Sequence, residues 1–175
     1  ARMLIDAFMP EGITQLAVDS IFMMPQLGVL ANIDKEELKD DASQAALEVF
    51  DNDCLIRLGT CVSPVGKAKP KSKMADVTMS FKDGSTKTIE IKEGSLEMME
   101  VPYEEVKVHI EPSRGIDVGA GKGEPLDSII YGGVVGLIFD GRNRPITLST
   151  DPSQRIDSLL NWSSAVDEYP KGDLF

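Results

Sequence analysis

Residues 75–92 read ADVTMSFKDGSTKTIEIK, and this stretch decides the fold class. Apolar and polar side chains alternate on both sides of Lys82-Asp83-Gly84-Ser85, and an Asp-Gly pair between alternating runs is a strong signal for a tight hairpin. Val77 and Met79 then share one face of the first strand, with Thr78 on the other. The stretch predicts an antiparallel β-hairpin with one buried face.

The same alternation extends outward from this hairpin, from Asp53 to Pro145, and predicts a β-rich region. Short strands separated by turn signals in so short a region are typical of a small antiparallel barrel. The predicted strands are 54–62, 75–81, 86–92, 105–111, 128–132 and 134–139.

Helical spacing of apolar residues flanks the β-rich region on both sides. Residues 3–9 predict the end of a helix, 34–50 an acidic amphipathic helix, and Thr150-Asp151-Pro152 the capped start of a C-terminal helix. The fold class is therefore α+β and mainly β: a small antiparallel β-barrel flanked by N-terminal helices and one C-terminal helix. The expected division is 1–50, 51–150 and 151–175.

Composition excludes several classes of function. The chain has 175 residues and a formal charge of −11, which would repel a phosphate backbone or an anionic membrane, so neither nucleic acid nor a membrane is an expected partner. No apolar run is long enough to span a bilayer.

Cys54 and Cys61 lack the paired spacing of a zinc site and are interpreted as buried thiols of a cytoplasmic protein. The first residue is Ala1 in mid-pattern, which suggests a piece of a longer protein.

The glycine-rich run 115–123 is the strongest candidate for binding an anion. It lacks the leading glycine and the Ser or Thr that a phosphate loop requires, so a structural loop is the competing interpretation. The turn at 140–144 adds two arginines that suit bidentate anion contacts, or that are simply exposed to solvent. The candidate anion residues are Gly119, Gly121, Lys122, Gly123, Arg142 and Arg144.

No catalytic set is evident. His109 is the only histidine, and the alternation from Glu105 to Glu111 puts it on a polar face. The glutamates of 90–105 are interpreted as a solvated acidic surface. The lysines of 67–73 are interpreted as a flexible loop or, alternatively, as a docking segment for an acidic partner. We therefore expect no enzyme activity, metal or cofactor in this fragment.

The segment 21–33 is apolar on most faces and needs to be covered by something. A docking surface for another protein or for a second copy of the chain is one interpretation, and burial under missing parts of a parent protein is the other. The candidate partner-binding residues are Phe22, Met23, Met24 and Leu27.

A resemblance to a known family extends from residue 1 to about 167. Four motifs carry it: ITQLAVD at 13–19, LIRLGTCVSPVG at 55–66, PSRGIDVG at 112–119 and GGVVGLIFDGRNRP at 132–145. In this order they resemble the C-terminal part of the MutL-type accessory proteins of methylaspartate (glutamate) mutase.

The resemblance implies a parent protein with an actin-like ATPase portion, of which residues 1–33 would be the end of the second subdomain. The ATPase motifs of the family precede the region present here, so no ATPase residue carries over. It implies a chaperone-like role in assisting or reactivating cobalamin-dependent mutases or aminomutases. The expected function is protein docking to mutase subunits or self-association. The alternative is a small ligand- or anion-binding domain that uses the Gly115–Gly123 loop with Arg142 and Arg144.

Overall fold

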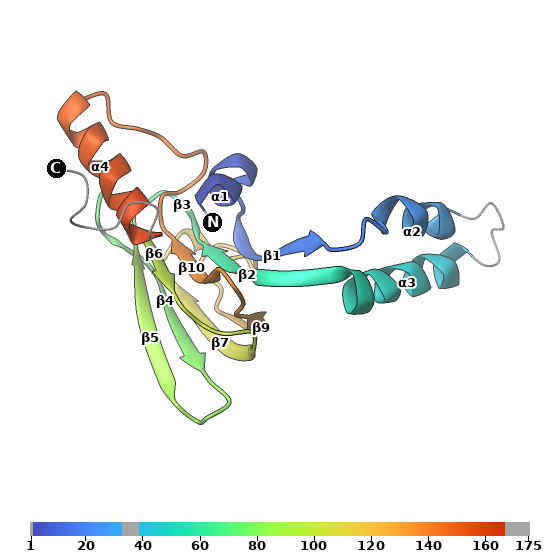
Figure 1. The fold of residues 1–175 in the computed structure, drawn as a ribbon. Coiled ribbons are helices and arrows are strands. Elements are labelled where there is room, and N and C mark those ends of the chain that lie inside the picture. Colours follow the sequence, from blue (N-terminus) through green and yellow to red (C-terminus); the bar gives the residue numbers. More distant parts are fainter. Residues whose placement is uncertain (1, 33–38, 167–175) are drawn as a thin grey trace. The chain divides into compact units, whose positions relative to one another are not determined.

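The computed structural model describes residues 2–32 and 39–166, which form a mixed helix and strand fold dominated by strands (Figure 1). The predicted α+β class, mainly β, is confirmed. The elements are α1 (Arg2–Phe8), β1 (Gly12–Asp19), α2 (Met24–Ala31), α3 (Lys39–Val49), the π-helical turn η2 (Phe50–Cys54), β2 (Leu55–Ser63), β3 (Val65–Gly66), β4 (Lys73–Ser80), β5 (Thr86–Lys92), β6 (Leu96–Met99), β7 (Glu105–Pro112), β8 (Ile116–Asp117), β9 (Leu126–Tyr131), β10 (Gly136–Asp140) and α4 (Pro152–Ala165).

The chain divides into two compact units. We call Ala1–Leu16 with Gly59–Phe175 the sandwich unit, and Ala17–Leu58 the hairpin unit. These boundaries differ from the sequence-based division at 50/51 and 150/151, because α1 and α4 contribute to the same apolar cluster although they lie at opposite ends of the chain.

Two four-stranded sheets organise the strands, in the orders β1-β2-β10-β6 and β5-β4-β7-β9. The predicted β-hairpin at 75–92, which belongs to the sandwich unit, is confirmed, since β4 pairs antiparallel with β5 and Val77 lies opposite Ile89. In the second sheet β7 alternates strictly between exposed and buried residues, as a strand with one covered face must. The two sheets face each other across the main core.

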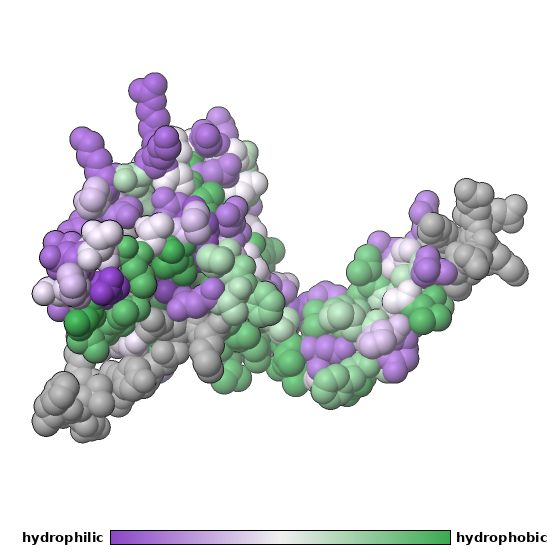
Figure 2. Space-filling view, turned by 90° about the horizontal axis from the view of Figure 1, so that it is seen from above, coloured by the Kyte–Doolittle hydropathy of each residue, from purple (hydrophilic) through white to green (hydrophobic). Residues whose placement is uncertain are grey.

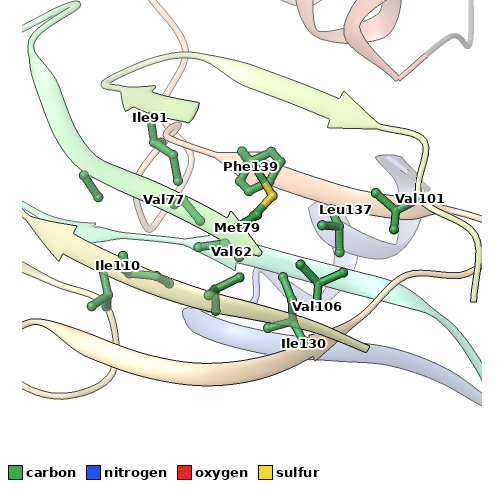
Figure 3. Close-up of a cluster of buried hydrophobic side chains, with 13 residues drawn as sticks. Val62, Val77, Met79, Ile91, Val101, Val106, Ile110, Ile130, Leu137 and Phe139 are labelled. Carbon is green, nitrogen blue, oxygen red and sulfur yellow. The ribbon is translucent and has the colours of Figure 1, made fainter. Parts of the chain in front are cut away.

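The main core lies between the two sheets (Figure 3). Phe139 and Leu137 of β10 meet Val77 and Met79 of β4 there, and all four side chains are fully buried. Burying an aliphatic side chain of this size stabilises a fold by about 1.5–3 kcal/mol, so this alternating face accounts for much of the unit's stability.

A second cluster covers the other face of the first sheet. Ile5 of α1 and Trp162 of α4 pack with Ile138 of β10, which makes α1 and α4 a helical layer on the side away from the second sheet (Figure 1). Trp162 also donates a hydrogen bond of 2.9 Å from its indole nitrogen to the carbonyl oxygen of Gly94. Asp151 caps α4 by accepting from the Gln154 amide, as predicted.

The predicted antiparallel barrel is not what the described strands form. They lie in separate sheets that do not close on each other, and β10 pairs with β2 in parallel. Alternation predicts which strands have one covered face, but it does not distinguish a barrel from two stacked sheets. The helical layer explains the difference, because it buries both faces of β10 and gives the strand no exposed side.

The hairpin unit pairs α2 with α3 over a small core of Leu27, Ala46 and Cys54. Met23 and Phe50 are partly buried against it. The predicted acidic helix is confirmed over its second half as α3, whereas its predicted capping box at Asp34 and Glu37 lies outside the described residues.

Candidate functional site

The two arginines that sequence reasoning placed in an anion site are structural. The Arg142 side chain is 1% exposed, the Arg144 side chain is 4% exposed, and both contact the carboxylate of Asp140, at 2.8 and 2.9 Å. Arg142 also lies 2.7 Å from Asp6 of α1 and stacks over Trp162 of α4. The expectation that these arginines are either exposed or free to bind a ligand is therefore wrong.

Asp140 is the centre of this buried cluster. Burial raises the pKa of its carboxyl group, but hydrogen bonds and charges from Arg142 and Arg144 lower this pKa by more than burial raises it. The net pKa therefore lies below the ordinary value. Arg144 uses its remaining donors on the backbone carbonyls of Pro10 and Asn143. The cluster connects the end of β10 to α1, α4 and the segment before β1, and its two arginines pair with Asp140 and Asp6.

The glycine-rich run forms a loop with hydrogen bonds between its own residues. The Asp117 carboxylate accepts from the amides of Gly119 and Gly121, at 2.7 and 3.1 Å. The Gly123 amide donates to the carbonyl of Ile116. These three amides already have acceptors within the loop, so they are not available to cradle a phosphate.

An open hollow of about 540 Å³ lies beside this loop in the sandwich unit. It brings together Lys122 and Arg144 of the predicted set, but it does not include Arg142, Gly119, Gly121 or Gly123. Lys67 also lines the hollow but was not among the predicted anion residues, since its lysine-rich segment was interpreted as a flexible loop or as a docking segment for an acidic partner. The lining residues are Glu11, Val65, Gly66, Lys67, Gly115, Lys122, Asn143 and Arg144.

The wall of the hollow is fixed by Asn143. Its side-chain amide donates to the Gly66 carbonyl at 2.6 Å, and its side-chain oxygen accepts from the Gly66 amide at 3.2 Å. Asn143 itself has φ 64°, a left-handed conformation that asparagine tolerates better than most residues. This double hydrogen bond holds the turn after β10 against β3.

The exposed apolar side chains of the hairpin unit form the second candidate site. Phe22 is 81% exposed and Met24 58%, as expected of partner-binding residues. Met23 is instead half-buried against the unit's core and Leu27 is part of that core, so these two of the predicted four support the fold. Figure 2 shows hydrophobic side chains on the surface of this unit, among hydrophilic ones. We define the apolar hairpin surface as Ile21, Phe22, Met24, Val29, Leu30 and Leu47.

Phe22 is held outward by a local turn. The Asp19 carboxylate accepts hydrogen bonds from the backbone amides of Ile21, Met23 and Met24, at 3.3, 3.2 and 3.0 Å. These bonds, that of Met24 first, keep the pKa of Asp19 below its ordinary value. Phe22 sits inside this turn at φ 56°, which is rare for an aromatic residue.

The remaining candidates for chemistry have structural settings. His109 is exposed on β7, as predicted, and its Nδ1 lies 2.8 Å from Asp127 of β9. Both cysteines are buried and unpaired, also as predicted. Across residues 2–32 and 39–166 no three His, Cys, Asp or Glu side chains are grouped to hold a metal ion. In the same ranges no helix has the length and apolar character to cross a bilayer.

The buried thiols give a first prediction. Burial raises the pKa of Cys61 to about 12, and burial also raises the pKa of Cys54, so neither forms thiolate near pH 8. We expect Ellman's reagent to modify the native protein slowly and the denatured protein at once. Cys54 should react first, because its unit has the smaller core and opens more readily.

The variants Cys54→Ser and Cys61→Ser separate the two rates. Immediate modification of the native Cys54→Ser variant, in which only Cys61 is left, would contradict the assigned burial.

Comparison with protein-family models, with curated proteins and with solved structures finds no match to this chain.

Proposed function

We propose that the chain is a non-catalytic docking domain that binds another protein through the apolar hairpin surface. One observation carries the proposal: the hairpin unit exposes nine large apolar side chains, six of which make up the apolar hairpin surface, around a core of three buried residues. Scattered apolar residues are normal on a surface, but a concentration of them on one small element marks a protein contact. By the family resemblance, the partner is a subunit of a cobalamin-dependent mutase or aminomutase.

The charge of the hairpin unit favours a partner over a second copy. Residues 17–58 include nine acidic and three basic residues, a net of −6 within a chain of −11. Two copies would bring two strongly acidic elements together, whereas an apolar groove with Lys and Arg at its rim would complement both features. The proposed partner surface is therefore apolar at its centre and basic at its edge.

Rigid presentation of Phe22 supports the same role. A left-handed aromatic residue costs free energy in the unbound chain, and the three hydrogen bonds to Asp19 hold it there. A segment whose backbone is already held in place loses less conformational entropy on binding, which makes Phe22 the expected anchor of the interface.

Substitution tests this anchor. The full chain is mixed with each purified mutase subunit, and complexes are measured by size-exclusion chromatography with light scattering and by titration calorimetry. We expect one subunit to bind, and Phe22→Ser to weaken that binding by about tenfold or more, the typical loss for a buried aromatic anchor. Raising the salt concentration should also weaken it, because the rim is charged.

The matched control is Val134→Ser. Val134 is an apolar residue that is 90% exposed, but it belongs to the sandwich unit. The substitution Val134→Ser should leave the affinity for the mutase subunit unchanged. Equal losses in both variants, or a dimer that binds no subunit, would overturn the proposal.

A further inference from the structure

We propose that the open hollow of the sandwich unit binds a phosphorylated small molecule, with the ammonium groups of Lys67 and Lys122 as its phosphate contacts. The site is separate from the docking surface and does not depend on the proposed function. It also differs from the arginine site expected from the sequence, because Arg142 and Arg144 are neutralised by Asp140 and Asp6.

Backbone pairing brings the two lysines to one hollow from distant parts of the chain. β3 pairs antiparallel with β8, and Val65 lies opposite Asp117. Asp117 is bridged in turn to Lys122. Lys122 therefore stands two strand spacings, each about 4.8 Å, from the strand that leads into Lys67. Lysine side chains are long enough to meet over one ligand at that separation.

The two lysines have no competing partner within the described ranges. Lys67 and Lys122 line the hollow, and neither forms an ion pair with a described residue. By contrast, Lys73 and Lys92 pair with Asp76 and Glu90. Two unpaired ammonium groups beside one hollow make the local charge positive, in a chain whose net charge is −11.

Hydrogen bonds within the chain hold the segments around the two lysines in place without a ligand. Asn143 fixes Gly66 next to Lys67, and Asp117 fixes the loop that carries Lys122. A preformed site loses less free energy on binding than a mobile loop does. The volume of about 540 Å³ is within the usual range of small-molecule sites.

Phosphate is the favoured ligand chemistry, because lysine binds it as a compact point charge. Two such charges from different segments suit a group that carries two phosphates. Glu11 lines the same hollow, and its negative charge repels an anion. The proposal therefore predicts that removing the charge of Glu11 strengthens binding.

Titration calorimetry with inorganic pyrophosphate, at constant ionic strength, tests the site on the full chain. We expect saturable binding by the natural sequence, and a loss of about tenfold or more in Lys67→Ala/Lys122→Ala, as removal of charge-assisted hydrogen bonds predicts. Glu11→Gln should tighten binding by about twofold to fivefold, because it removes a repulsive charge.

The matched control is Lys87→Ala/Lys107→Ala, which removes the same charge from exposed positions on β5 and β7. It should bind pyrophosphate as the natural sequence does. An equal loss in both double variants would show general charge attraction and overturn the site. Weaker binding by Glu11→Gln would also overturn it, and citrate binding as tightly as pyrophosphate would refute the preference for phosphate.

Discussion

Replacing Asp140 by Asn is expected to destabilise the sandwich unit by about 3–5 kcal/mol, the usual cost of removing one partner from a buried ion pair. Asn keeps the shape of the side chain but removes the charge that holds Arg142 and Arg144, whose side chains are almost fully buried. Most domains are stable by only about 5–15 kcal/mol, so the loss is large. Chemical denaturation followed by far-UV circular dichroism measures it.

The control for this prediction is Asp76→Asn. Asp76 pairs with Lys73 at 2.7 Å, but the two side chains are 31% and 46% exposed, so solvent screens the pair and the expected loss is below about 1 kcal/mol. Equal effects of the two substitutions would contradict the assigned role of Asp140.

Acid provides a second measurement of the same cluster. The folded state lowers the pKa of Asp140 below its ordinary value of 3.8, so the folded protein binds fewer protons there than the unfolded chain. This stabilisation is complete above 3.8 and is lost as the pH falls through the lower folded pKa. The free energy of unfolding of Asp140→Asn should therefore fall less steeply on acidification than that of the natural sequence.

Replacing Gly59 by Ala is expected to destabilise the chain by about 3 kcal/mol or more, because the first sheet cannot accept a side chain there. Gly59 of β2 lies directly opposite Gly136 of β10, and an added Cβ would overlap the carbonyl oxygen of Gly136. That obstacle is backbone of the first residue of β10, a strand that is buried throughout, so no side-chain rotation relieves it. Thermal or chemical unfolding of the variant tests the expectation.

Gly28→Ala is the matched control for Gly59→Ala. Gly28 lies within α2, where an added Cβ meets no atom within 4 Å. Alanine favours a helix over glycine by about 0.5–1 kcal/mol, so this variant should be slightly more stable than the natural sequence. A stability close to the natural one for Gly59→Ala would contradict the close approach of β2 and β10.

Strand positions could be read from the sequence because each strand carries its own alternation. Residues 86–92 were predicted with the bounds that β5 has, and Asp83-Gly84 marked the turn before it. β6, β3 and β8 were missed, since two to four residues are too few to show a period. The stacking of two sheets was also missed, because it depends on contacts between segments that are distant in sequence.

The candidate sites were only partly predictable for the same reason. The apolar character of 21–33 is local, so a docking segment could be recognised, but only the packing of α2 on α3 separates exposed Phe22 from buried Leu27. Arginine at 142 and 144 gave no sign of burial, because distant segments cover these side chains: Asp6 and Trp162 contact Arg142, and the Pro10 carbonyl accepts from Arg144. Lys67 and Lys122 meet only through the pairing of β3 with β8.

Hydrogen–deuterium exchange of the full chain, alone and with each candidate mutase subunit, tests the central claim of docking through the hairpin unit most directly. The account predicts that one subunit slows exchange in peptides covering Ile21 to Ala31 and the second half of α3, with little change in β4, β5 and β7. Protection confined to the sandwich unit, or no protection with any subunit, would contradict it.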